Sequence, residues 1–249
     1  MKTRHTIAVF LMFFSIPLFS DDLLDQAIEL IQNNRLQEAK PILQTGIDSG
    51  KKDERYFQYL GYIYEYEESY EKAIDVLQKG LKIGEQRKQA GQGNSVDIFY
   101  NNLGDVYYSI KDYTNAEIMF TRAIEDNYSF SDCYKKRAMV RNILGDNLLT
   151  LNDFETAKQM YQGAIDDAEK YLLFRSEASD KETIIAWIAL LKSRIDNVDN
   201  EVEAERQRQQ ALLDAILNSL ANASEDTENI SAGSENIIID DDDDDELAD

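Results

Sequence analysis

The sequence predicts an all-α protein, and three observations carry that prediction. Only two of the 249 residues are proline and 11 are glycine, whereas a sandwich or barrel needs many turn residues. Four segments repeat apolar and small residues at spacings of 3 and 4, which place them on one face of a helix. The last third carries apolar residues at alternating spacings of 4 and 3, as a long helix would.

Residues 1–20 have the layout of a secretory signal peptide. A basic start precedes the apolar run Ile7 to Phe14, and the small residue Ser20 stands where cleavage is expected. We therefore expect an exported protein, periplasmic or secreted, whose mature chain begins at Asp21 and has no stable membrane span. The alternative is a membrane anchor formed by the uncleaved segment, because Leu18 is a poor residue three positions before the cut.

Composition excludes several classes of function. The one histidine, His5, lies in the segment expected to be removed, so the mature chain has no imidazole base or imidazole metal ligand. We expect no cofactor and no metal. The formal net charge of -22 repels phosphate backbones, which argues against nucleic acid as a partner.

Internal repeats organise residues 21–175. Each of four segments carries an aromatic residue or leucine, then an alanine, a large residue and a small residue on one helical face; the alanines are Ala39, Ala73, Ala116 and Ala157. Another small residue stands twelve positions before each alanine, at Ala27, Gly61, Gly104 and Gly145. Each unit is therefore predicted to be a hairpin of two helices, whose small residues lie where the helix axes approach.

Two of these units resemble the tetratricopeptide repeat family. The matching residues are Leu60-Gly61, Tyr64, Ala73 and Leu77 in one unit and Leu103-Gly104, Tyr107, Ala116, Phe120 and Ala123 in the next. The resemblance implies a right-handed superhelix of about four hairpins, with a concave groove lined by the first helix of each. Later units depart from the family spacing of 34 residues. The first insertion predicts a longer helix or a loop around Gly91 and Gly93, and the second a long helix over about 131–151.

The C-terminal third is predicted to contain two further segments. Residues 176–221 form a capping helix whose apolar side covers the last repeat, as open-ended stacks require. Self-association of this helix as a coiled coil is the alternative, although its seam becomes polar at Glu205 and Gln209. Residues 222–249 contain 12 acidic residues and no Lys or Arg, which predicts a disordered acidic tail.

The favoured function is binding of another protein, through a peptide or helix segment, by a non-catalytic scaffold or adaptor of the cell envelope. In family geometry the candidate groove residues would be Tyr59, Tyr62, Tyr66, Asn101, Asn102, Asp105, Tyr108 and Lys136. Tyrosine presents a large ring with a hydrogen-bonding tip, which suits such recognition. Some family members bind a terminal carboxylate through a set of basic and amide side chains. Here Gln58, Tyr62 and Asp132 stand where a Lys, an Asn and a Lys would be needed, so this mode of binding is disfavoured.

Two other functions stay open. The chain could be an accessory subunit that helps an envelope transporter capture small ligands, as some similar repeat proteins do. An enzyme is the less favoured class, because catalysis would rest on carboxylate, Tyr or Lys side chains alone. Paired acids such as Asp166-Asp167 are expected on solvated faces, as is usual in an acidic helical chain.

Overall fold

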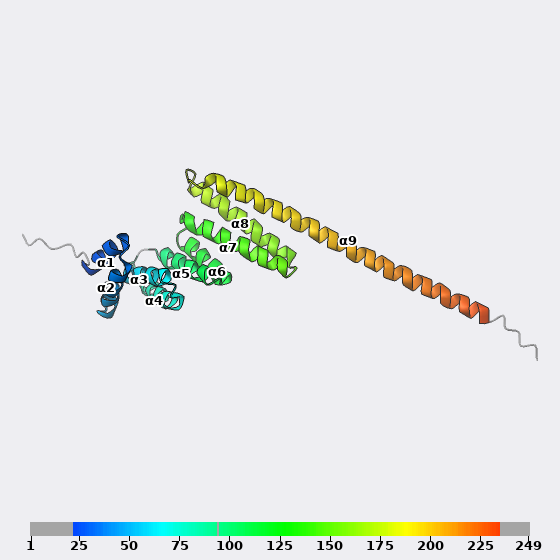
Figure 1. The fold of residues 1–249 in the computed structure, drawn as a ribbon, viewed down its shortest axis with the longest axis horizontal. Coiled ribbons are helices and arrows are strands. Elements are labelled where there is room, and N and C mark those ends of the chain that lie inside the picture. The colour runs from blue at the N-terminus through cyan, green and yellow to red at the C-terminus, as the bar shows by residue number, and fades with distance from the viewer. Residues whose placement is uncertain (1–21, 94, 235–249) are drawn as a thin grey trace, which may run out of the picture. The chain divides into compact units, whose positions relative to one another are not determined.

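The computed structural model describes residues 22–93 and 95–234, and this part of the chain forms nine α-helices and no strand (Figure 1). The helices are α1 (Asp22–Gln32), α2 (Leu36–Asp48), α3 (Arg55–Tyr66), α4 (Tyr70–Gln89), α5 (Asp97–Ser109), α6 (Tyr113–Asp126), α7 (Ser131–Thr150), α8 (Phe154–Phe174) and α9 (Lys181–Ser234). The first eight pack as four successive hairpins, and each hairpin also contacts the next. The prediction of an all-α repeat fold is confirmed.

Small residues allow the two helices of a hairpin to touch. A Cβ atom added to Gly61 would lie 2.5 Å from the side chain of Leu77, and one added to Gly104 would lie 2.5 Å from the ring of Phe120. The same contact recurs in the last hairpin, where Gly145 faces Tyr161 at 2.7 Å. The predicted close approach is confirmed, because no larger residue fits at these positions without displacing its neighbour.

The turn inside each hairpin has the same backbone form. One residue adopts a positive φ two positions before the second helix begins; these residues are Asn34 (58°), Glu68 (56°), Lys111 (63°) and Asn152 (58°). In the last two hairpins an aspartate follows and caps the helix: Asp112 accepts from the backbone N–H of Asn115, and Asp153 from that of Thr156. The repeat seen in the sequence is therefore also a repeat of turn geometry.

The two insertions take the expected forms. The first lengthens α4 to Gln89 and adds a turn in which Gly91 has a φ of 68°. The second produces the 20-residue helix α7, which ends at Thr150, one residue from the predicted end. Both insertions leave the contacts inside the hairpins in place.

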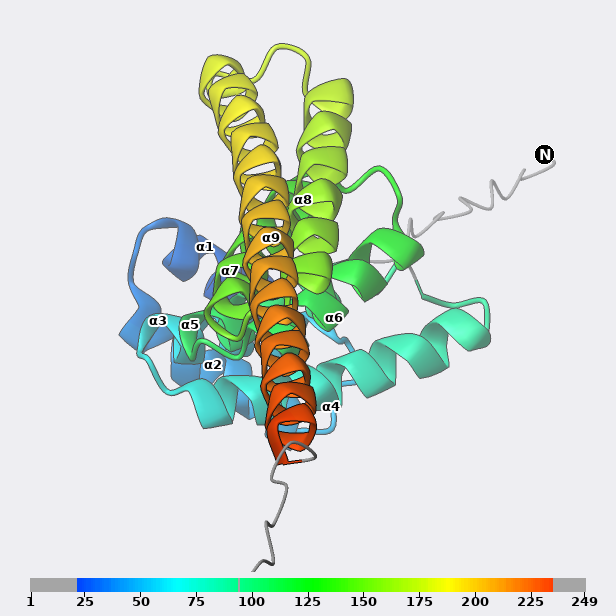
Figure 2. The same ribbon diagram turned by 90° about the vertical axis from the view of Figure 1, so that its right-hand side faces the viewer.

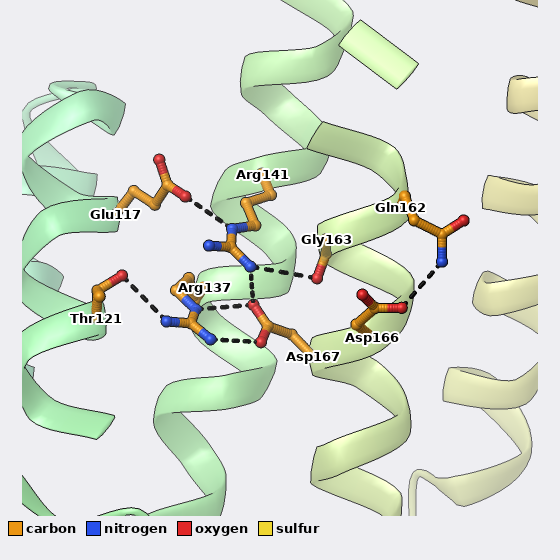
Figure 3. A network of polar contacts seen from close by, with 8 residues as sticks. All are labelled: Glu117, Thr121, Arg137, Arg141, Gln162, Gly163, Asp166 and Asp167. Atoms are coloured by element: carbon orange, nitrogen blue, oxygen red, sulfur yellow. Dashed lines mark hydrogen bonds and ion pairs between the residues drawn. The ribbon is translucent and has the colours of Figure 1, made fainter. Parts of the chain in front are cut away.

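An ion-pair network joins α6, α7 and α8 (Figure 3). Asp167 accepts two hydrogen bonds from Arg137, at 2.8 and 2.6 Å, and one from Arg141 at 3.0 Å. Arg141 also donates to Glu117 at 2.7 Å. Asp167 is only 3% exposed, so the expectation that Asp166-Asp167 lies wholly on a solvated face is wrong. The burial of Asp167 could not be predicted from the sequence around it, because both arginines that bind it lie on the facing helix α7.

The chain divides into two compact units within the long helix α9. The first unit ends at Leu191, and the second begins at Lys192. In the first unit, the beginning of α9 runs antiparallel to α8 after a short turn (Figures 1 and 2). Ile184, Ile188 and Leu191, three of the apolar residues assigned to a capping helix, are buried there. None of the helices in the described ranges is apolar over a stretch long enough to cross a membrane.

The second unit differs from the sequence prediction at its end. The helix continues to Ser234, whereas helix was expected for 176–221 and disorder for 222–249. No proline interrupts the segment after 221, and the first glycine is Gly233, so helix propensity persists to that point. The remainder of the expected tail, 235–249, lies outside the described residues, as does the expected signal peptide.

Candidate functional site

All eight predicted groove residues lie on the first helices of consecutive hairpins, α3, α5 and α7. We call the side chains that these helices leave accessible the first-helix surface. Its aromatic members are unevenly exposed: Tyr62 is 44% exposed, Tyr66 64% and Tyr108 36%, whereas Tyr59 is half-buried. Tyr108 rests edge-on against Tyr113 of α6, with ring centroids 5.7 Å apart. Three of the four predicted tyrosines are therefore accessible to a partner.

The predicted polar residues form one hydrogen-bonded cluster. Lys136 of α7 donates to Asp105 at 2.6 Å and to the side-chain oxygen of Asn101 at 2.8 Å. The amide nitrogen of Asn101 donates in turn to Asn102 at 3.0 Å and to Asp105 at 3.2 Å. Asn101 is 6% exposed and its amide is already engaged, so we remove it from the side chains available to a partner. Its structural role is to tie α5 to α7.

Cys133 lies beneath this cluster. Its side chain is fully buried, as expected from its place in a helical pattern, and its thiol lies 3.5 Å from the side-chain oxygen of Asn101. Burial raises the pKa of the thiol to about 12. The thiol is therefore protonated and unreactive at neutral pH.

Glu65 of α3 faces the same cluster. Burial, together with the negative charge of Asp105, raises the pKa of its carboxyl group from 4.5 to about 7, while Lys136 acts in the opposite direction. Burial likewise raises the pKa of Asp105, although Lys136 and Asn101 bind its charged form. Lys136 is the cation that acts on both carboxyl groups, so this part of the first-helix surface carries an excess of negative charge when both groups are ionised.

An open cavity of about 410 Å³ lies beside the cluster. Its lining residues come from α5, α7, the turn before α9 and the first two turns of α9: Tyr108, Lys135, Met139, Asn142, Ile143, Asp180, Thr183, Ile184 and Trp187. We call it the Trp187 pocket. Its apolar members form a concave surface of the kind that receives a large side chain of a ligand.

Asp180 lines this pocket and is held in place by two hydrogen bonds. Its carboxylate accepts from Lys135 of α7 at 3.0 Å and from the hydroxyl of Tyr171 of α8 at 2.8 Å. The hydrogen bond from Lys135, followed by that from Tyr171, lowers the pKa of Asp180. These contacts connect the α8–α9 turn to both helices of the last hairpin, so the beginning of α9 is held where Trp187 can line the pocket.

Sequence reasoning missed the contribution of α9 to the site. On α7, Lys135 and Met139 were expected to face the groove together with Lys136, and helical periodicity could have extended that stripe to Asn142 and Ile143. Trp187 gave no such signal, because its position depends on the α8–α9 turn. Among the described residues, no three His, Cys, Asp or Glu side chains are grouped so that they could hold a metal ion.

Comparisons with known proteins agree with the repeat geometry. A family model described as tetratricopeptide repeat matches residues 55–86 and 99–125, which correspond to the second and third hairpins. No curated protein matches the sequence. A solved tetratricopeptide repeat protein from Parabacteroides merdae is 13% identical, with a TM-score of 0.52 over 76% of this chain and 67% of that one.

A second solved structure, the Cut9-Hcn1 hetero-tetramer of APC/C, gives a similar result. The identity is 16% and the TM-score 0.51, and the match covers 66% of this chain and 28% of the other. At these identities the likeness concerns the fold alone. It supports a helical solenoid of stacked hairpins.

Proposed function

We propose that the chain, which matches the tetratricopeptide repeat family over its second and third hairpins, is a protein-interaction scaffold that binds a peptide or helix of another protein on the first-helix surface. The observation that carries the proposal is the exposure of large apolar side chains on successive first helices. Tyr62 and Tyr66 on α3, Tyr108 on α5 and Met139 on α7 are between 36% and 64% exposed. Such side chains are typical anchors of protein interfaces.

We propose a non-catalytic role for this surface. The side chains of Asn101, Asp105 and Lys136 hydrogen-bond to one another, and the bonds from Lys136 connect α7 to α5. A catalytic acid or base needs access to a substrate proton. Polar contacts of this kind instead support a rigid platform for the exposed tyrosines.

We also propose that the protein works in the cell envelope, after export directed by residues 1–20. The support is the basic, apolar and small-residue order of that segment. An adaptor in this compartment would hold its partner near other envelope proteins. An accessory role with a small-ligand transporter is the alternative, and it is favoured if the partner is a transporter subunit.

Site-specific photo-crosslinking in cells tests the binding surface. A photoreactive phenylalanine analogue is placed at Tyr62 or at Tyr108, and the matched control position is Ile118, which lies on the second helix α6 and is 42% exposed. We expect the same protein to be captured from Tyr62 and Tyr108 and not from Ile118. Capture from Leu217 of α9, with none from either tyrosine position, would overturn the proposal.

A further inference from the structure

The Trp187 pocket and the excess negative charge lie close together on the first-helix surface. Asp105 of the polar cluster and Tyr108 of the pocket are three residues apart on α5, and Lys136 and Met139 have the same relation on α7. Residues three apart lie on one helical face, within about one turn or 5.4 Å along the axis. A short extended segment can therefore reach both features at once.

Glu65 of α3 has no direct partner, although it faces the polar cluster that borders the pocket. Its side chain makes no hydrogen bond or ion pair with any residue of the described ranges, whereas the ammonium group of Lys136 contacts Asp105. Tyr62, three residues before Glu65 on α3, is 44% exposed. A carboxylate next to an accessible aromatic ring is a favourable environment for a cation.

Resting on the proposed function, we infer that the partner segment carries a large apolar side chain that fills the Trp187 pocket and a basic side chain, Lys or Arg, that pairs with Glu65. Charge complementarity supports this choice of partner. The whole chain carries a formal charge of -22, of which residues 222–249 supply -12. The remaining -10 still attracts basic segments and repels acidic ones. The local charges of Glu65, Asp105 and Lys136 sum to the same sign as the whole chain.

The inference has a consequence for pH dependence. The groups that face Glu65 are Asp105 of α5, which raises the pKa of its carboxyl group, and Lys136 of α7, which lowers it. A bound cation favours the ionised form of Glu65, so binding releases a proton below about pH 7. The affinity of a basic segment should therefore increase from pH 5.5 to pH 8.

Selection from a phage-displayed library of random 12-residue peptides on the full chain at pH 8 provides the first test. We expect the selected peptides to combine a large apolar residue with Lys or Arg. With Glu65→Lys, selection should switch from basic to acidic residues while the apolar requirement persists. Peptides without a basic residue, peptides enriched in acidic residues, or no selected peptides at all would each overturn the inference.

Fluorescence titration tests the pocket directly, because Trp187 is the one tryptophan of the sequence. A selected peptide without tryptophan should change the Trp187 emission on binding. Met139→Asp should weaken binding at least tenfold, whereas Ile118→Asp should not, although the two parent side chains are similarly exposed, at 40% and 42%. Circular dichroism checks that both variants are folded, and unchanged affinity in folded Met139→Asp contradicts the pocket assignment.

The two proposals fail differently. If Tyr62 and Tyr108 crosslink a partner whose contacting segment lacks a basic residue, the proposed function stands and this inference is wrong. If neither position crosslinks a partner, the proposed function itself fails.

Discussion

Asp167 of α8 and Arg137 of α7 form a paired, two-point contact, with hydrogen bonds of 2.6 and 2.8 Å between one carboxylate and one guanidinium group. Arg141 binds the same carboxylate at 3.0 Å. Asp167 therefore compensates two cations while only 3% of it is exposed. Removing one member of such a buried network leaves the remaining charges unpaired in a poorly hydrated environment.

We expect Asp167→Ala to lower the free energy of unfolding by about 3–5 kcal/mol, because Arg137 and Arg141 lose their shared counter-ion. Urea denaturation measures the change. The matched control is Asp75→Ala, which removes a pair with Lys79 in which both side chains are more than 60% exposed. That pair should contribute less than about 1 kcal/mol. Equal losses in the two variants would contradict the structural role of the network.

The Gly104–Phe120 contact gives a second prediction. Gly104→Ala should destabilise the fold by roughly 1–3 kcal/mol, although alanine is the better helix former, because its Cβ atom would lie 2.5 Å from the Phe120 ring. Thermal unfolding measures the effect, with exposed Ser109→Ala at the end of α5 as the control. Adding Phe120→Leu to Gly104→Ala should recover part of the loss. No destabilisation by Gly104→Ala would mean that the helices are not in contact there.

Glu65 gives a prediction for pH. Because the pKa of its carboxyl group is raised to about 7 in the folded protein, the folded state holds a proton that the unfolded state loses above about 4.5. Its contribution to stability is therefore greatest at low pH and is lost as the pH rises through 7. Glu65→Gln should raise the melting temperature at pH 8 and change it much less at pH 5. Exposed Glu71→Gln is the control, and a gain from Glu65→Gln that is the same at both pH values counts against this assignment.

Cleavage of a signal peptide during export would give the mature protein a defined N-terminus. Protein isolated from the envelope of its source cell should begin at or near Asp21, because Ser20 ends a segment with the order of a signal peptide. Intact-mass spectrometry measures the start. A membrane-bound form that retains residues 1–20 would replace export by anchoring.

We predict that the protein self-associates through the second unit, the part of α9 that begins at Lys192. Five large apolar side chains lie within one short stretch of this helix and are 48–63% exposed: Leu212, Leu213, Ile216, Leu217 and Leu220. A contiguous exposed apolar stretch usually marks a contact surface. Leu213→Asp with Leu217→Asp should lower the mass measured by sedimentation equilibrium. A parent protein that is monomeric at high concentration would exclude self-association.

Local pattern was sufficient to predict the hairpins but not the contacts between distant segments. Gly61, Gly104 and Gly145 could be predicted because a short helical contact leaves a fixed spacing in the sequence. The burial of Asp167 could not, since it depends on arginines 26 and 30 residues away. The place of Trp187 depends on the α8–α9 turn, which no periodicity describes.

Buried Cys133 has a practical consequence for biophysical work on this protein. It is the one cysteine of the sequence, and its thiol is protonated at neutral pH because burial raises its pKa to about 12. Maleimide reagents should therefore modify an engineered surface cysteine and leave the native one untouched. Spin labels or fluorophore pairs can then be attached to α3 and α7 in the otherwise native sequence, so that movements between repeats can be followed as distance changes in solution.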